Sequence, residues 1–177
     1  METLEFDAGQ FGLSPQPDVH IELSDAEATR RLGAIFAERL SGGIFVGLVG
    51  ALGAGKTTFV KGLVETLAAG ETARSPTYTL LNEYETTPPV IHVDLYRLDS
   101  YDELETTGYW DFVEARGVIA CVEWLDRIPA AWPGEGSIVA LSHRNDGTRS
   151  ARIWLADSSP DVLVEHLRDS FAEASDG

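Results

Sequence analysis

The strongest constraint on the fold lies between residues 44 and 67, where three patterns follow one another. Residues 44–49 read IFVGLV, a short apolar run that is typical of a strand buried on both faces of a parallel sheet. A glycine-rich stretch follows, and apolar residues then recur at helical spacing from Phe59 to Leu67. The segment therefore predicts a strand, a glycine loop and an amphipathic helix in direct succession.

The glycine-rich stretch, residues 50–57, reads GALGAGKT and matches the pattern G-x-x-x-x-G-K-[ST]. Glycines let successive backbone amides approach an anion, and the N-terminus of the following helix faces the same place. Lys56 would place its charge near the β and γ phosphates of a nucleotide, and Thr57 would offer a hydroxyl to Mg²⁺. A chance glycine turn is the alternative, and the flanking strand and helix argue against it. We therefore expect ATP and Mg²⁺ as cofactors, with nucleotide contacts from Gly50, Gly53, Ala54, Gly55, Lys56, Thr57 and Thr58.

Two further apolar runs, Val90 to Asp94 and Val118 to Glu123, each end in a carboxylate. In open α/β sheets, ligands bind beyond the carboxyl ends of the strands, so both acids are expected to face the nucleotide. They would hold Mg²⁺ or orient the attacking water. The predicted catalytic residues are Lys56, Asp94 and Glu123, and the predicted metal ligands are Thr57, Asp94 and Glu123. Which acid activates water stays open, and either acid could instead merely end its strand.

His92 lies two residues before Asp94, so a regular strand places both side chains on one face. For His92 a packed, hydrogen-bonded histidine is favoured over a catalytic one. Trp124 directly follows Glu123 and is interpreted either as packing or as a lip of the site. Arg97 is expected to contact phosphate or to pair with an acid.

The remaining segments predict an α/β fold: a P-loop NTPase-like three-layer sandwich with a mainly parallel central sheet and a C-terminal antiparallel hairpin. Ser24 and Glu27 form a capping box before one helix, and Ser100 and Glu103 form one before another. Asn145-Asp146-Gly147 is a strong hairpin signal. We predict a flexible extension over residues 1–18, one domain over residues 19–172, and an acidic tail over residues 173–177.

The composition of the chain argues against nucleic acids and membranes as direct partners. The chain of 177 residues carries 13 basic and 29 acidic side chains, a formal net charge of −16, which would repel a phosphate backbone. Tight unaided binding to tRNA is therefore not expected. No apolar run reaches the roughly 18 residues that a membrane helix needs, and residues 1–18 do not read as a secretory signal. The expected location is the cytoplasm, with no membrane partner.

Four segments together resemble one family. They read GALGAGKTT at residues 50–58, SPTYT at 75–79, HVDLYRL at 92–98 and VEW at 122–124. Their order and spacing, over roughly residues 21–155, are similar to the TsaE family (formerly YjeE), bacterial ATPases required for threonylcarbamoyladenosine formation in tRNA. SPTYT and HVDLYRL together with the glycine loop are highly specific, whereas that loop alone is shared by many families.

The resemblance implies roles for particular residues. Thr57 and Glu123 would be Mg²⁺ ligands, and Asp94 would be a further catalytic or metal-organising acid. Residues 75–79 would form a loop that senses the γ-phosphate, and the helix start around Ser24 to Thr29 would lie near the adenine. The implied partners are TsaD and TsaB, which transfer the threonylcarbamoyl group made by TsaC onto the adenosine next to the anticodon. ATP hydrolysis would reset that complex between rounds.

One position departs from the family, and three other functions compete with the ATPase interpretation. The family often has aspartate where this chain has Ala51, which puts any side-chain role there in doubt. A GTPase is disfavoured because neither asparagine is followed by lysine. A small-molecule kinase should carry an arginine-rich lid, and the arginines here are scattered. An ATP-binding regulatory module with little hydrolysis is the remaining alternative, and hydrolysis by the isolated chain is expected to be slow.

Overall fold

The computed structural model describes residues 6–68, 70–76, 79–144, 146–157 and 161–172. These residues form the following helices and strands. In chain order, they are η1 (Ala8–Phe11), β1 (Val19–Leu23), α1 (Ala26–Arg39), β2 (Ile44–Val49), α2 (Lys56–Leu67), β3 (Leu81–Tyr84), β4 (Val90–Asp94), α3 (Tyr101–Glu105), α4 (Tyr109–Val113), β5 (Ile119–Glu123), η2 (Leu125–Arg127), η3 (Pro129–Ala131), β6 (Ser137–His143), β7 (Arg149–Trp154) and α5 (Asp161–Ala172).

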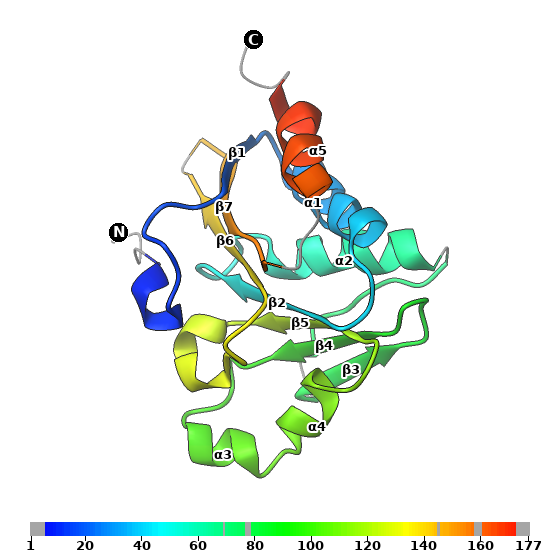
Figure 1. Cartoon of the computed structure of the whole chain (residues 1–177), viewed down its shortest axis with the longest axis vertical. Helices are drawn as coiled ribbons and strands as arrows, with labels where there is room; N and C mark the ends of the chain where they lie inside the picture. Colours follow the sequence, from blue (N-terminus) through cyan, green and yellow to red (C-terminus); the bar gives the residue numbers. More distant parts are fainter. Residues whose placement is uncertain (1–5, 69, 77–78, 145, 158–160, 173–177) are drawn as a thin grey trace.

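Within the described residues, seven strands form one sheet in the order β1-β7-β6-β2-β5-β4-β3 (Figure 1). The four central strands, β6, β2, β5 and β4, are parallel to one another. The outer strands add antiparallel pairings, β6 with β7, β7 with β1, and β4 with β3. The mixed α/β class, the parallel centre and the C-terminal hairpin are therefore confirmed, while Asn145 of its turn lies outside the described residues. Since β2, β5 and β4 are parallel neighbours, their carboxyl ends meet at one edge.

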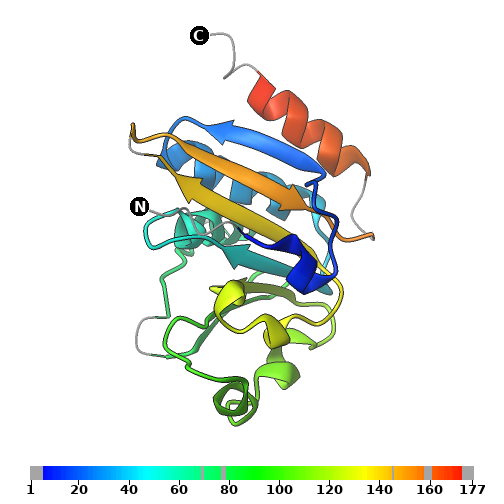
Figure 2. The ribbon, with the colours of Figure 1, turned by 90° about the vertical axis from the view of Figure 1, so that its left-hand side faces the viewer.

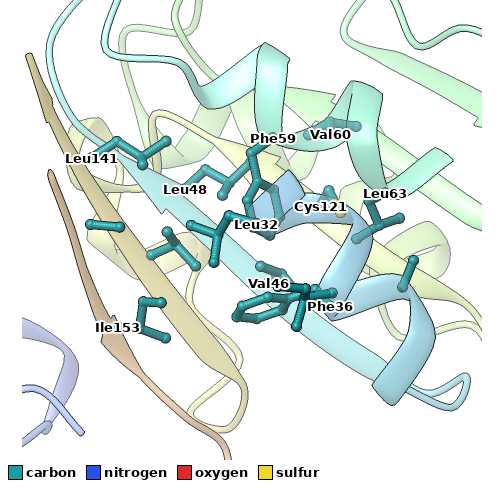
Figure 3. Packing of buried hydrophobic residues seen from close by; sticks show 14 of the residues in the cluster. Leu32, Phe36, Val46, Leu48, Phe59, Val60, Leu63, Cys121, Leu141 and Ile153 are labelled. Carbon is teal, nitrogen blue, oxygen red and sulfur yellow. The ribbon is translucent and has the colours of Figure 1, made fainter. Parts of the chain in front are cut away.

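The sheet is covered on both faces, because alternate residues of each central strand enter two different cores. Val46 and Leu48 of β2 join the core beneath α1, α2 and α5, whereas Phe45 and Val49 join the core on the side of α3 and α4. Figure 3 shows the first core, in which Phe36 of α1 meets the Phe59 ring edge-on at 5.1 Å. These two buried layers make the central strands a rigid base for whatever their carboxyl ends carry.

Helices α1 and α2 approach each other closely through two glycines. A Cβ added at Gly33 would lie 2.0 Å from the Phe59 carbonyl oxygen, and one at Gly62 would lie 1.8 Å from the Arg30 carbonyl oxygen. Helix α1 is capped by Asp25, whose Oδ1 accepts a hydrogen bond from the Ala28 amide at 2.8 Å. The predicted cap, Ser24, was therefore wrong by one residue. At α3 the prediction is confirmed, since the Ser100 hydroxyl accepts from the Glu103 amide at 3.2 Å.

The N-terminal segment differs from the flexible extension that was expected. Within residues 6–18, Phe11 is buried and its ring lies 6.0 Å from that of Trp132, while Phe6 lies 4.9 Å from Trp154. The Trp154 indole also donates a hydrogen bond to the Ser14 carbonyl at 2.8 Å. Figure 2 shows this dark blue segment passing in front of the sheet. Scattered aromatic side chains, which follow no helical or strand period, hold the segment in place.

In the part of the chain that the structure describes, no helix combines the length and apolar character needed to span a membrane.

Candidate functional site

The glycine loop between β2 and α2 depends on backbone angles that glycine alone adopts easily. Gly50 has φ +136°, and a Cβ there would lie 2.2 Å from the Leu141 carbonyl oxygen of β6. Gly55 has φ +113°, and its Cβ would lie 3.0 Å from the Thr29 methyl group of α1. Gly55 also caps α2 without a side chain, so the first amides of that helix keep their donors for another partner. The loop thus fits closely between β6 and α1, and its free amides are available to an anion. We call residues 50–57 the cradle.

Lys56 is buried, and its ammonium folds back over this loop. Its Nζ donates to the carbonyl oxygens of Gly50 at 2.6 Å and Ala51 at 2.9 Å. The same Nζ lies 3.6 Å from the centroid of the Trp124 ring, a cation–π contact. Burial lowers the pKa of Lys56, an effect opposed by the negative charges of Glu123, Asp126 and Asp94. Two carbonyl oxygens and the Trp124 ring therefore fix the Lys56 side chain beside the glycine loop.

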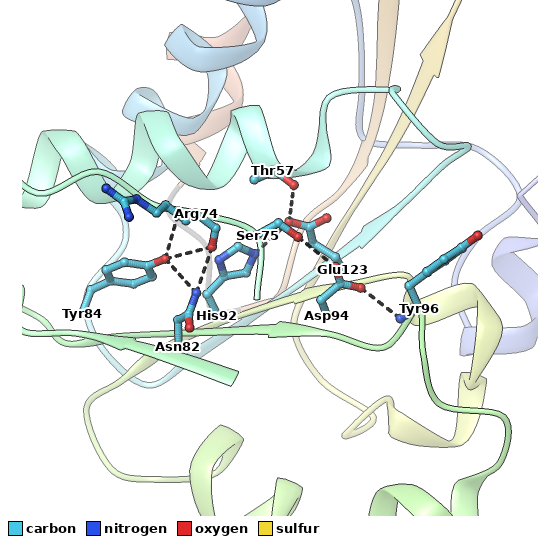
Figure 4. Close-up of polar contacts among 9 residues, drawn as sticks. All are labelled: Thr57, Arg74, Ser75, Asn82, Tyr84, His92, Asp94, Tyr96 and Glu123. Carbon is cyan, nitrogen blue, oxygen red and sulfur yellow. Dashed lines mark hydrogen bonds and ion pairs between the residues drawn. The ribbon is translucent and has the colours of Figure 1, made fainter. Parts of the chain in front are cut away.

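Glu123 and Asp94, the two predicted acids, are direct neighbours across the sheet because β4 and β5 pair them in register. Glu123 is buried, and its Oε1 accepts from the Thr57 hydroxyl at 2.9 Å. The same oxygen contacts His92 Nε2 at 2.8 Å. Asp94 accepts from the Ser75 hydroxyl at 3.1 Å and from the Tyr96 amide at 2.9 Å. Figure 4 shows both carboxylates below the start of α2.

A side-chain clamp on the chain before Ser75 was not anticipated from the sequence. The Tyr84 hydroxyl accepts from the Arg74 amide at 3.0 Å and donates to the Arg74 carbonyl at 3.2 Å. The Asn82 side-chain amide also donates to that carbonyl, at 2.9 Å (Figure 4). Asn82 and Tyr84 both project from edge strand β3 toward the chain at Arg74. Their spacing of two was the available signal, since it places them on one face of a strand.

A pocket of about 560 Å³ joins these parts, and its lining includes Lys56, Thr57, Asp94, Glu123 and Trp124. A larger hollow of about 700 Å³ lies between α1, α2 and α5. That hollow is crossed by the hydrogen bond from Arg30 to Glu65, at 2.7 Å, and it has no contact with the glycine loop. The smaller pocket is the candidate site because it combines residues of the glycine loop with the two acids.

An aromatic stack forms one wall of this pocket. The Trp124 ring lies 4.8 Å from that of Tyr96, and the Arg127 guanidinium lies 5.1 Å from the Tyr96 ring. Trp124 is also the one non-glycine residue with positive φ, 61°, within the described residues. Residues in this strained region concentrate at functional sites. Trp124 lines the pocket and contacts Lys56, which is consistent with the alternative of a lip over the site.

Comparisons with known proteins address the family. The family model described as "Threonylcarbamoyl adenosine biosynthesis protein TsaE" matches residues 23–152. The chain belongs to the TsaE family. The Nostoc sp. protein named tRNA threonylcarbamoyladenosine biosynthesis protein TsaE is 41% identical over 75% of this chain and 83% of its own. The Bacillus subtilis protein of the same name is 33% identical over 81% and 87%.

A solved structure extends the likeness to three dimensions. The crystal structure of Bacillus subtilis YdiB superposes with a TM-score of 0.69 at 26% identity, covering 86% of this chain and 95% of that chain. The TsaE-like motifs thus fall on a TsaE-like fold. The predicted resemblance to the family is confirmed.

The family-implied adenine contacts stay predictions. Thr29 is buried and touches the loop at Gly55, which is consistent with a position near the nucleotide. Ser24 instead lines the larger hollow between the helices. Of the implied sensing loop at residues 75–79, Thr77 and Tyr78 lie outside the described residues, whereas Ser75 and Thr79 line the pocket.

The donor set fits a nucleotide-bound Mg²⁺ better than a metal held by protein alone. Thr57 and Glu123 place two oxygen groups side by side at the pocket, joined by their 2.9 Å hydrogen bond. Among the described residues, no group of three histidine, cysteine, aspartate or glutamate side chains could hold a metal ion. Mg²⁺ commonly uses one or two protein oxygens and completes its shell with phosphate and water.

Proposed function

We propose that this chain is a Mg²⁺-dependent P-loop ATPase that supports threonylcarbamoyladenosine modification of the tRNA adenosine next to the anticodon. It would act with a TsaD–TsaB type complex and reset that complex between catalytic cycles. The observation that carries the proposal is the convergence of the glycine cradle, the Lys56 ammonium and the Thr57–Glu123 pair in one pocket. The pathway rests on family membership and on the names of the relatives.

Each side chain has a defined task in this proposal. The loop amides and the first turn of α2 bind the phosphates, and Lys56 exchanges its contacts with Gly50 and Ala51 for phosphate oxygens. Mg²⁺, when bound, neutralises charge on the phosphates. Thr57 and Glu123 would hold that ion, and Asp94 would orient the water for attack or organise the metal's surroundings.

The acidic surface determines how the chain takes part in tRNA modification. A net charge of −16 disfavours direct contact with a phosphate backbone, so the partner proteins hold the tRNA. The ATPase then acts on the partners rather than on the nucleic acid. A tight, salt-sensitive affinity of the isolated chain for tRNA would contradict this division of labour.

The test is multiple-turnover threonylcarbamoylation of unmodified tRNA by the partner proteins, with wild-type chain, with Lys56→Ala, or with neither. Lys61→Ala is the matched control, because Lys61 is the only other lysine and lies outside the pocket lining, on α2. We expect sustained turnover with wild type and the control, and a single round without them. Equal turnover without the chain would remove the pathway assignment. ATP affinity of Lys56→Ala equal to wild type would remove the nucleotide site.

A further inference from the structure

We propose that His92 is a positioning residue that fixes the Glu123 carboxylate for metal binding. This inference rests on the proposed function. It concerns a buried side chain that the reaction itself does not touch. The structure places His92 directly beneath the pair formed by Thr57 and Glu123 (Figure 4).

The first step of the argument is the geometry at Glu123 Oε1. This one oxygen receives two contacts, from Thr57 Oγ1 at 2.9 Å and from His92 Nε2 at 2.8 Å. A carboxylate oxygen has two lone pairs, so both are used. Both of these contacts fall on Oε1 rather than on Oε2. The side chain is therefore held by one oxygen, which leaves the other for an ion or its water shell.

The second step is the hydrogen-bond direction. An ionised carboxylate only accepts, so His92 Nε2 carries the hydrogen and donates. Nδ1 of His92 is buried and has no partner among the described residues. A hydrogen on Nδ1 would leave a buried donor unsatisfied, which is costly, and a hydrogen on Nε2 alone avoids this. We therefore assign that tautomer, in which the ring can only donate to Glu123.

The third step is the rigidity of the donor. His92 is fully buried in β4, and its partner stands on the adjacent strand β5. The Tyr84 ring of β3 stacks against the imidazole, with centroids 6.3 Å apart. Three neighbouring strands thus fix the imidazole, so the direction of its N–H is built into the sheet. Thr57 gives the same carboxylate a second donor from the first turn of α2.

Partners that orient a metal ligand have a characteristic effect when they are removed. Metal affinity or activity falls by about 10–100-fold, while contacts that do not involve the metal persist. His92→Phe keeps a flat ring and removes the donor. His92→Gln restores an N–H group at a similar reach. The exposed His143 at the end of β6 offers a matched control as His143→Phe.

The experiment measures the affinity for a non-hydrolysable ATP analogue by calorimetry, in excess Mg²⁺ and in EDTA, after thermal melts confirm folding. For His92→Phe we expect the EDTA affinity to stay within about twofold of wild type and the gain from Mg²⁺ to fall about tenfold. His92→Gln should recover most of that gain, and His143→Phe should match wild type. His92→Leu replaces the phenylalanine variant if the latter does not fold.

The outcomes separate this inference from the function on which it rests. A folded His92→Phe or His92→Leu protein with the full gain from Mg²⁺ would overturn the role of His92 alone. Equal loss in the phenylalanine and glutamine variants would also overturn it, since core packing would then explain both. A wild-type chain that binds no nucleotide in either condition would remove the proposed function as well.

Discussion

The two sides of the pocket are built in different ways. The cradle side is one continuous segment, in which the backbone of residues 50–57 makes the site and Lys56 bonds to its own loop. The acid side is assembled from separate strands, in which His92, Asp94 and Glu123 meet because β4 and β5 are in register. A backbone site depends on the space around single glycines, whereas a side-chain site depends on hydrogen bonds between elements. Substitutions on the cradle side should therefore act through steric clashes with the backbone, whereas substitutions on the acid side should act through the loss of hydrogen bonds.

The largest expected effect is on the cradle side, for Gly50→Ala. Its Cβ would lie 2.2 Å from the Leu141 carbonyl oxygen at a φ of +136°, so the loop must leave β6 or distort. We expect a loss of roughly 3 kcal/mol or more in unfolding free energy, together with loss of ATP binding. Chemical denaturation and calorimetry measure the two effects.

Gly43→Ala is the control for backbone strain. Gly43 also has a positive φ, +89°, but it lies outside the glycine loop, and a Cβ there would meet nothing within 4 Å. It should cost roughly 1–2 kcal/mol and leave ATP affinity unchanged. If both variants bind ATP equally well, ATP binding by the glycine loop does not depend on the close packing of Gly50 against β6.

The same difference between the two sides explains which parts of the site could be predicted from the sequence. The cradle was predictable because its strand, glycines and helix are contiguous from residue 44 to 67, and the period of each part is visible. The strand ends at Asp94 and Glu123 were predictable for the same reason. Their functional roles stay predictions.

What could not be predicted depends on register and on packing between distant segments. The clamp from Asn82 and Tyr84 to Arg74 needs β3 to pair with β4 as the outermost strand, and no local pattern specifies that order. His92 was assigned to a strand face, but its contact with Glu123 depends on β5, 31 residues away. Phe6 and Phe11 carried the missed signal at the N-terminus, where two aromatic residues stand in a segment with no helical or strand period.

The next effect compares the two acids. Glu123 contacts Thr57, whereas Asp94 bonds to Ser75 and to the Tyr96 amide. We expect Asp94→Asn to retain the gain in ATP affinity from Mg²⁺ while turnover falls about 100-fold. Glu123→Gln should lose that gain as well as turnover. ATPase assays with the partner proteins, alongside calorimetry, measure both quantities.

Asp102→Asn serves as control for the loss of one negative charge, because Asp102 is exposed on α3. It should behave as wild type in both assays. If Asp94→Asn abolishes the gain from Mg²⁺ and Glu123→Gln preserves it, the roles of the two acids are exchanged.

A smaller effect is expected at the clamp. Tyr84→Phe removes the hydroxyl that bonds to both the amide and the carbonyl of Arg74, at 3.0 and 3.2 Å. The local free energy of opening should fall by about 1 kcal/mol, the usual contribution of a net hydrogen bond. Hydrogen exchange at residues 70–76 should then quicken about fivefold. Tyr101→Phe, which removes an acceptor for the Trp110 indole, is the control and should leave this segment unchanged. Unchanged exchange in Tyr84→Phe would mean that Asn82 alone holds the loop.

The smallest effect concerns Asp126, a third acid near Lys56 that differs from the other two. Its Oδ1 is buried and has no partner among the described residues. Burial raises the pKa of Asp126, opposed by its own backbone amide and by the charges of Lys56 and Arg127. Because the pKa is higher in the folded than in the unfolded chain, ionisation destabilises the fold. That cost is present above the folded pKa and disappears below the ordinary aspartate value of about 4.

Asp126→Asn should therefore raise Tm at pH 7 by roughly 1–3 °C, and the difference should shrink as the pH falls toward about 4. The exposed Asp157 provides the control variant Asp157→Asn, which should show no such pH dependence. A lower Tm for Asp126→Asn at pH 7 would mean that the attraction to Lys56 outweighs burial. The expected result would set Asp126 apart from Glu123 and Asp94, which accept hydrogen bonds from other elements of the fold. Such hydrogen bonds between elements distinguish the acid side from the cradle.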